Sequence, residues 1–264
     1  MIENVVIIGA GNLATQLALA LAEKGIAVKQ VYSRKMESAK ELAEKLNAEF
    51  TNNLSELVPD ADLYLIAVKD SAIHEVLENL RLDNNPLIVH TAGSVPMDIL
   101  EGFSNTYGVF YPLQTFSKSR KIDFSEIPVC IEANHPSTIL KLEKLAERLS
   151  SSVNQINSDE RKTLHLAAVF VNNFVNHFYV VGAEILQAKK LSFDLLKPII
   201  RETAAKIETL HPVEAQTGPA RRNDQSIIQS QLKMLHGEPE LQKIYSFVTE
   251  SIFQLNQKHE HDLF

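Results

Sequence analysis

The sequence predicts an α/β fold followed by an all-helical domain. Three observations support this prediction. The chain opens with a strand, a glycine-rich turn and a helix; short apolar runs then alternate with helical patterns to about residue 150; and no strand-like pattern follows Ser158. Such alternation is typical of a mostly parallel sheet with helices on both faces, because parallel strands are joined by crossover helices. We place one domain at residues 1–156 and the helical domain at residues 157–264.

The first element is an apolar strand at residues 5–8, followed by Gly9-Ala10-Gly11-Asn12-Leu13-Ala14 and a helix that ends near Gly25. In this pattern Gly9 allows the tight turn, Gly11 lets the backbone approach a pyrophosphate, and Ala14 permits close packing of helix on strand. Unpaired N–H groups and the dipole favour negative charge at a helix N-terminus. We therefore expect a Rossmann-type dinucleotide site at Gly9, Gly11, Asn12 and Leu13; the alternative is a structural turn.

The second strand, residues 27–32, runs into Ser33-Arg34-Lys35 without an acidic residue at its end. Folds that prefer NAD place a carboxylate there to hold the ribose 2′-hydroxyl. Ser33, Arg34 and Lys35 instead offer hydrogen-bond donors and positive charge for a 2′-phosphate. The pattern predicts NADP(H) as the cofactor, with an exposed basic turn as the alternative.

The remaining elements of the first domain follow in alternation. We expect helices at residues 37–46, 71–80 and 136–149, and strands at residues 63–68, 87–90, 107–111, 128–132 and 152–156. Ligands of such sheets bind outside the carboxyl ends of the strands. This rule assigns Ala67, Val68, Lys69, Thr91, Ala92 and Gly93 to the cofactor, and Tyr111 and Gln114 to a substrate.

Helices are expected at residues 158–189, 193–210, 224–235 and 239–258 in the second domain, with Ser158 as the N-cap of the first. On that helix a period of 3.6 residues places His165, Asn172 and Asn176 on one face, and Asn173 on an adjoining face. An imidazole and carboxamides could donate a proton and polarise a hydride acceptor. We take these four residues as catalytic candidates; an interhelical polar network or a dimer contact is the alternative.

A loop between helices, residues 216–224, contains Thr217, Gly218-Pro219, Arg221 and Arg222. The functional interpretation has Thr217 and Arg221 binding an anionic substrate or the cofactor, across the cleft or from a second subunit. The alternative is a capped turn with solvated arginines.

Composition excludes several classes of protein. A formal charge of −7 argues against nucleic-acid binding. A single cysteine, Cys130, precludes a disulfide framework and favours the cytoplasm, and no signal peptide is visible. The longest apolar stretch, residues 166–185, is interrupted by amides, His177 and Glu184, so no membrane span is expected. No metal site is expected either, because the terminal cluster at residues 259–262 falls in a tail that we expect to fray.

Several motifs resemble a known family. The turn at residues 9–14, Ser33-Arg34, Ile66-Ala67-Val68-Lys69 and the helical second half resemble the pyrroline-5-carboxylate reductase and 6-phosphogluconate dehydrogenase superfamily. Tyr111-Pro112-Leu113-Gln114-Thr115-Phe116, Val171-Asn172-Asn173-Phe174 and Gln216-Thr217-Gly218-Pro219-Ala220-Arg221 are similar to a bacterial family of NADP oxidoreductases with a C-terminal domain of unknown function. The resemblance implies NADP binding and a homodimer formed through the C-terminal helices.

The chain also departs from the better-known relatives. Asp70 follows Lys69 where those reductases usually have proline, and the lysine of the hydroxyacid dehydrogenases is missing from the long helix. Proline synthesis is therefore not inferred. We expect an NADPH-dependent reductase of a C=N or C=O group in a small anionic metabolite, bound in an interdomain cleft. The alternatives are a non-catalytic NADP(H) sensor and a deazaflavin-linked oxidoreductase.

Overall fold

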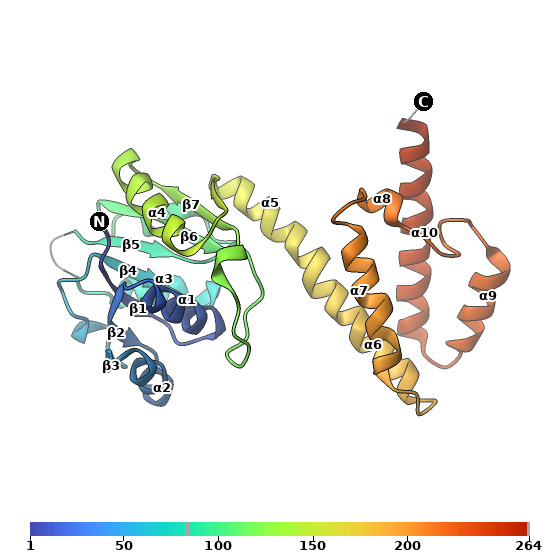
Figure 1. Ribbon diagram of the computed structural model, residues 1–264, viewed down its shortest axis with the longest axis horizontal. Coiled ribbons are helices and arrows are strands. Elements are labelled where there is room, and N and C mark those ends of the chain that lie inside the picture. Colours follow the sequence, from blue (N-terminus) through green and yellow to red (C-terminus); the bar gives the residue numbers. More distant parts are fainter. Residues whose placement is uncertain (83–84, 263–264) are drawn as a thin grey trace. The chain divides into compact units, whose positions relative to one another are not determined.

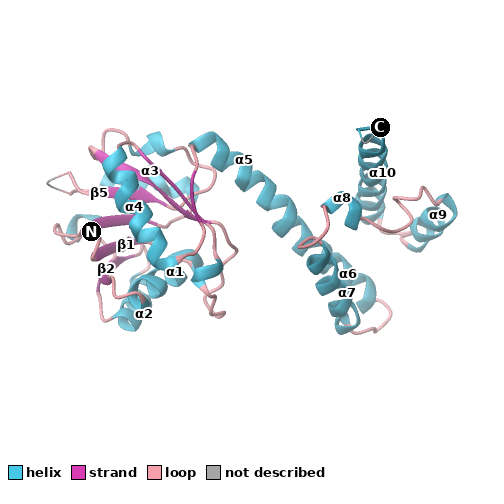
Figure 2. Cartoon of the chain, turned by 45° about the horizontal axis from the view of Figure 1, so that its top comes forward, coloured by secondary structure: helices cyan, strands magenta, loops and turns pink. Residues whose placement is uncertain are grey.

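The structure is a computed structural model that describes residues 1–82 and 85–262. The chain forms two compact units, Met1–His177 (unit 1) and Phe178–Phe264 (unit 2), and each is described by itself. The division lies later than residue 156 because the helix that follows the last strand packs its first turns on the sheet. All the strands among the described residues lie in unit 1 (Figure 2).

Unit 1 contains one eight-stranded sheet in the order β3-β2-β1-β4-β5-β6-β7-β8 (Figure 1). Every neighbouring pair is parallel except β6 and β7, which are antiparallel. The strands are β1 (Asn4–Ile8), β2 (Ala27–Tyr32), β3 (Glu49–Thr51), β4 (Leu63–Ile66), β5 (Leu87–His90), β6 (Thr106–Pro112), β7 (Val129–Ala133) and β8 (Val153–Gln155). The strand order reverses between β1 and β4, and this is where open α/β sheets bind ligands.

Helices cover both faces of the sheet, as the sequence predicts. They are α1 (Asn12–Glu23), α2 (Met36–Leu46), α3 (Ile73–Asn79) and α4 (Pro136–Leu149). α5 (Ser158–Ala168) follows the last strand, and Arg161 is its one buried residue. Because successive side chains of a strand point to opposite faces, Val5 and Ile7 of β1 join the core under α1, α2 and α4, whereas Val6 and Ile8 join the core under α3. The two fully buried cores explain why the β1 sequence is a continuous apolar run.

The short strand β3 was not expected from the sequence. It is three residues long, and Glu49 and Phe50 are exposed at the edge of the sheet. An edge strand of this length carries no apolar run or alternation that a sequence pattern could reveal.

The long helix predicted from residue 158 is present over Ser158–Gln187, but its middle is not α-helical. A π-helical segment, Val169–Phe174, separates α5 from α6 (Val175–Gln187). The N-cap of α5 is Asn157 rather than the expected Ser158. The Asn157 side chain accepts hydrogen bonds from the N–H groups of Asp159 (3.0 Å) and Glu160 (2.9 Å), and the Glu160 carboxylate accepts from the Asn157 N–H (2.8 Å). This reciprocal pair is a capping box.

Unit 2 is helical, as expected, and its helices after α6 are α7 (Lys197–Lys206), α8 (Pro212–Ala215), α9 (Gln225–Met234) and α10 (Pro239–Asp262). α6 and α7 lie side by side (Figure 1). α10 continues to Asp262, so the backbone of the expected frayed tail is helical. Among the described residues of unit 2, only Ala220 and Ile228 are buried apolar side chains, while Leu195 is 67% exposed and Ile199 62% exposed. Such a unit buries too little apolar surface to be stable alone.

The continuous helical stretch Ser158–Gln187 is long and apolar enough, by length and composition alone, to cross a membrane. Its first turns are fixed to the sheet by a buried arginine, and it carries Asn172, Asn173, Asn176 and Glu184. Polar groups of this kind are costly in lipid.

Candidate functional site

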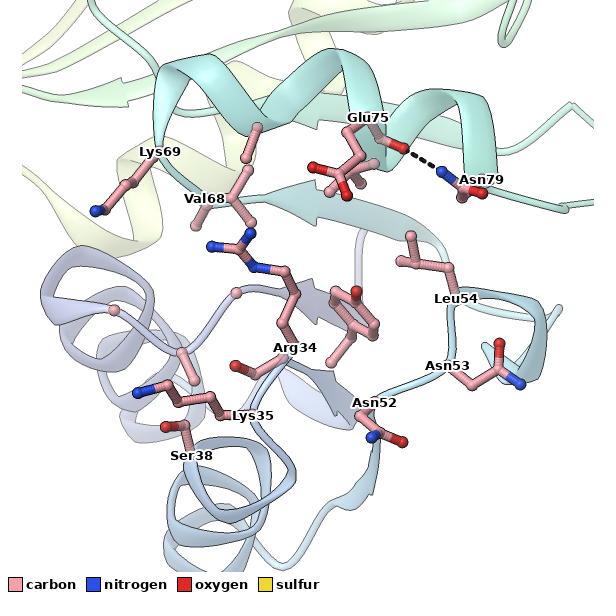
Figure 3. Close-up of a pocket in the computed structure, with 18 of the residues that line it drawn as sticks. Arg34, Lys35, Ser38, Asn52, Asn53, Leu54, Val68, Lys69, Glu75 and Asn79 are labelled. Carbon is pink, nitrogen blue, oxygen red and sulfur yellow. Dashed lines mark hydrogen bonds between the residues drawn. The ribbon is translucent and has the colours of Figure 1, made fainter.

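A cavity of about 1100 Å³ in unit 1 opens at the carboxyl ends of β1, β2 and β4. Its lining contains ten of the thirteen cofactor residues predicted from the sequence: Gly9, Gly11, Asn12, Leu13, Ser33, Arg34, Lys35, Ala67, Val68 and Lys69. We call this cavity the cofactor pocket (Figure 3).

The turn before α1 fits a pyrophosphate. α1 begins at Gly11 with no side-chain cap and no acidic residue in its first turn, so its first N–H groups are free to bind an anion. Gly9 has a φ of +131°, and a Cβ there would lie 2.2 Å from the carbonyl oxygen of Ala67. Only glycine allows β1, the turn and the end of β4 to approach this closely. A Cβ at Gly11 would meet nothing within 4 Å, so that space is open for a ligand.

Positive charge dominates the lining of the cofactor pocket. The described lining residues include four cations, Arg34, Lys35, Lys69 and Arg81, and one carboxylate, Glu75. Arg34 extends from the end of β2 towards Val68, with Lys35 and Ser38 beside it (Figure 3). No acidic residue occupies the position where a carboxylate would hold a 2′-hydroxyl. This arrangement fits the 2′-phosphate of NADP.

Other lining residues were missed by the sequence reasoning. They are Tyr32, Ser38, Asn52, Asn53, Leu54, Ser55, Ala72, Glu75, Val76, Asn79 and Arg81. Asn52 and Asn53 follow β3, so the rule of carboxyl ends would have found them if β3 had been recognised. Tyr32 is buried, and burial raises the pKa of its hydroxyl. The positive charge of Arg34 nearby has the opposite, smaller effect.

A second cavity of unit 1, about 340 Å³, brings together the end of β6 and the helix that begins with α5. We call it the His165 pocket. Its polar lining residues include Tyr111, Gln114, His165, Asn172 and Asn173, and the rest of the lining is largely apolar. Asn173 shares this pocket with His165 although a regular helix would put it on an adjoining face, because a π-helical segment has more residues per turn. Asn176 is not among the lining residues.

Two rings face each other in the His165 pocket. Tyr111 Oη lies 3.1 Å from His165 Nδ1, and the rings meet edge to face with centroids 6.2 Å apart. Burial raises the pKa of Tyr111 to about 12, with smaller contributions from Cys130 and Asp70. The phenol therefore keeps its proton at neutral pH and is available as a hydrogen-bond partner for the imidazole.

Gly93 makes this ring pair possible. A Cβ on Gly93 would lie 2.6 Å from His165 Nδ1 and 2.9 Å from Tyr111 Cζ. Thr91, Ala92 and Gly93 follow β5 and are not among the residues that line the cofactor pocket, and Gly93 lies against the two rings. The prediction that these three residues lie at the end of a strand is therefore correct, but Gly93 contacts the two rings instead of lining the cofactor pocket.

Arg161, one helical turn before His165, fixes the start of α5 to the sheet. The Arg161 side chain is 1% exposed; it forms an ion pair with Glu132 of β7 and donates from Nη2 to the Val95 carbonyl (2.6 Å). Ser158 adds hydrogen bonds to the Glu132 carboxylate. Breaking a buried ion pair of this kind strongly destabilises a protein. The sequence gives no signal for this pair, because Arg161 and Glu132 lie 29 positions apart in the chain.

The remaining predicted site residues lie in unit 2. Thr217 and Arg221 belong to the loop between α8 and α9, where Arg221 Nη1 donates to the carbonyl oxygens of Gln216 (2.7 Å) and Glu214 (3.5 Å). Arg221 therefore stabilises its own loop. A role of Thr217 and Arg221 towards a substrate stays a prediction.

Comparison with known proteins agrees with this geometry. Residues 4–93 match the family model described as NADP oxidoreductase, coenzyme F420-dependent, and residues 127–252 match a domain of unknown function, DUF2520. No curated protein is similar enough to count as a match.

Solved structures are similar over the whole chain. The imine reductase from Myxococcus stipitatus in complex with NADP⁺ has a TM-score of 0.66 at 16% identity, covering 98% of this chain and 94% of that one. The pyrroline-5-carboxylate reductase from Coxiella burnetii has a TM-score of 0.60 at 18% identity, covering 98% of each chain. At these identities the likeness shows the fold.

A much nearer relative is the "putative NADP oxidoreductase" from Bacteroides fragilis. It is 48% identical, with a TM-score of 0.90 over 96% of this chain and 98% of that one. The phosphate-binding turn, the basic end of β2 and this identity lead to one conclusion: the chain belongs to this family of oxidoreductases, which use NADP and join a Rossmann domain to a helical domain.

Proposed function

We propose that the protein reduces a C=N or C=O group of a small metabolite with NADPH, and that the His165 pocket receives the reacting group. The observation that carries this proposal is the Tyr111–His165 ring pair above Gly93, at the strand ends next to the cofactor pocket. NADPH supplies a hydride when bound. The protein must then supply a proton and hold the acceptor group in place.

His165 is the proton donor in this proposal. In the imidazolium form, Nδ1–H donates to Tyr111 Oη and Nε2–H is left for the acceptor atom; delivery of that proton leaves a neutral ring. A hydroxyl both accepts and donates, so Tyr111 keeps its contact with Nδ1 in either state of the ring. The amides of Asn172 and Asn173, in the lining of the same pocket, orient the substrate. The anionic character of the substrate, which the sequence assigned to Arg221, stays a prediction.

The proposal is tested by replacing His165 and measuring binding and turnover separately. Imines, oxo acids and related carbonyl compounds are screened for oxidation of NADPH, and His165→Ala is then compared with the wild type on the active compound. We expect turnover to fall by about 100-fold or more. The dissociation constant of NADPH should not change, because His165 does not line the cofactor pocket. Equal turnover of the two proteins would refute the donor role.

The same screen separates the alternatives. Tight binding of NADPH without turnover of any compound would refute the reductase and favour a sensor. The description of the matching family model names coenzyme F420. A deazaflavin is therefore included as an electron acceptor, and its reduction by NADPH would identify a deazaflavin-linked oxidoreductase.

We also propose that a second copy of the chain covers the exposed apolar side of the helices of unit 2. This unit has almost no buried apolar side chains of its own among the described residues, and Leu195 and Ile199 are more than half exposed. Light scattering after gel filtration should give twice the chain mass of 29.5 kDa. Leu195→Glu should yield monomers, whereas Leu140→Glu, at a 55% exposed position on α4, should not. A monomeric wild type would refute this proposal.

A further inference from the structure

We infer that Glu75 recognises the adenine base of the cofactor by accepting a hydrogen bond from its exocyclic amino group. The inference depends on NADP binding in the cofactor pocket, but not on the reaction proposed above. Glu75 is the one carboxylate among the described lining residues. The binding of the pyrophosphate and the 2′-phosphate gives no reason for a negative charge there.

The shape of the cofactor pocket indicates where the adenosine of NADP lies. A pyrophosphate at the N-terminus of α1 and a 2′-phosphate at Ser33 and Arg34 place the adenosine ribose between β1 and β2. From there the pocket continues past Leu54 and Val68 to α3, where Glu75 and Asn79 line it. The base, attached to that ribose, therefore reaches the wall formed by α3.

That part of the pocket suits a flat aromatic base. Its apolar wall consists of Leu54, Val68, Ala72 and Val76. The guanidinium of Arg34 extends across the pocket towards Val68 (Figure 3). A planar cation stacks well on an aromatic face, so Arg34 can cover one face of the base while it binds the 2′-phosphate next to it.

The side chain of Glu75 points into this space from α3, facing the pocket above Arg34 (Figure 3). The charge of Glu75 raises the pKa of the Tyr32 hydroxyl while that of Arg34 lowers it, so both charges lie close to the floor of the same pocket. The neighbouring Asn79 donates from Nδ2 to the Glu75 carbonyl oxygen (2.8 Å), and its Oδ1 is the neutral acceptor of the same wall. Glu75 thus offers the negatively charged acceptor of this wall.

A carboxylate in a pocket for a polyanion weakens binding unless it meets a hydrogen-bond donor. The edge of adenine carries such a donor in its amino group, and a bond to a charged acceptor is stronger than a neutral one. A purely structural interpretation is that Glu75 lies in the first turn of α3, where it interacts favourably with the helix dipole. That interpretation predicts no dependence of affinity on the identity of the base.

The experiment is calorimetric titration with NADP⁺ and with its hypoxanthine analogue, which has a carbonyl oxygen in place of the amino group. Wild type, Glu75→Gln and Glu78→Gln are compared. Glu78 is the matched control, because it is an exposed carboxylate of the same helix, lies 3.6 Å from His74 and does not line the pocket. Binding is measured without turnover, so failure of the proposed reaction would not affect the result.

We expect wild type and Glu78→Gln to bind NADP⁺ about ten-fold or more tightly than the analogue. Glu75→Gln should lose most of this preference, because a glutamine amide can donate to the carbonyl and accept from the amino group. An unchanged preference in Glu75→Gln, or no preference in the wild type, would overturn the inference. If neither nucleotide binds to any of the three proteins, the cofactor assignment is wrong and the inference fails with it.

Discussion

The burial of His90 predicts that the free energy of unfolding of the protein decreases at acidic pH. His90 ends β5, is fully buried, and braces the loop that carries Gly93: Nδ1 accepts from the Ala92 N–H (3.2 Å), and Nε2 lies 3.4 Å from the Pro96 carbonyl oxygen. Both contacts are satisfied by the neutral ring. Burial, helped by the positive charge of Arg161, lowers the pKa of His90 to about 4.

The magnitude follows from proton linkage. The ordinary pKa of histidine is 6.5, so between pH 6.5 and pH 4 the unfolded chain binds a proton at His90 that the folded chain does not bind. The free energy of unfolding therefore decreases as the pH falls through this window and is unaffected by His90 above it. The two pKa values differ by about 2.5 pH units, which corresponds to about 3 kcal/mol. This loss would unfold many domains of marginal stability.

The assay is urea denaturation at a series of pH values from 7 to 4, applied to the wild type and to His90→Asn. Asparagine keeps an acceptor near the Ala92 N–H and does not titrate, so the variant should lose about 3 kcal/mol less than the wild type over this range. His74→Asn is the control, since His74 is 65% exposed on α3 and should leave the wild-type pH dependence nearly unchanged. The same pH dependence in His90→Asn and in the wild type would refute the reasoning.

Three further predictions concern the two pockets. Gly93→Ala should lower turnover by about 100-fold through displacement of the His165 ring, with NADPH affinity unchanged in titrations; unaltered turnover would contradict the role of Gly93. Gly9→Ala should lower both the melting temperature and NADPH affinity, because its Cβ meets the Ala67 carbonyl at 2.2 Å, whereas Gly11→Ala should lower affinity alone. A normal melting temperature for Gly9→Ala would count against the clash. Arg34→Asp should raise the dissociation constant of NADPH about ten-fold or more and that of NADH much less; equal effects would argue against a 2′-phosphate contact.

Much of the cofactor pocket could be predicted from the sequence because its determinants are local. The glycines, the helix start and the basic turn after β2 lie within short segments whose geometry follows from strand, turn and helix. Three predicted cofactor residues, Thr91, Ala92 and Gly93, are not among the residues that line that pocket, and Gly93 lies instead against the Tyr111–His165 rings. The rule that ligands bind at the carboxyl ends of strands predicts at which edge of the sheet a residue lies. It does not predict which of two neighbouring pockets that residue lines.

The His165 pocket shows where sequence periodicity stops being informative. A regular α-helix would place Asn172 on the same face as His165 and Asn173 on an adjoining face. In the structure the segment is π-helical, and both residues line the pocket with His165. No residue type in the sequence predicts a π-helical segment. The Arg161–Glu132 pair, which fixes the start of this helix to β7, joins positions far apart in the chain, and neither residue is unusual where it stands.

The fold class, the phosphate-binding turn and the preference for NADP could be predicted from the sequence, since each depends on neighbouring residues whose local conformations are fixed by backbone sterics, apolar periodicity and charge. The tertiary structure was needed to show that Tyr111, Gly93 and His165 meet, that Arg161 ties the start of α5 to Glu132 of β7 and that Glu75 faces the cofactor pocket. These contacts join different strands and helices, and their distances depend on strand order, a π-helical segment and a buried ion pair, which no local pattern encodes.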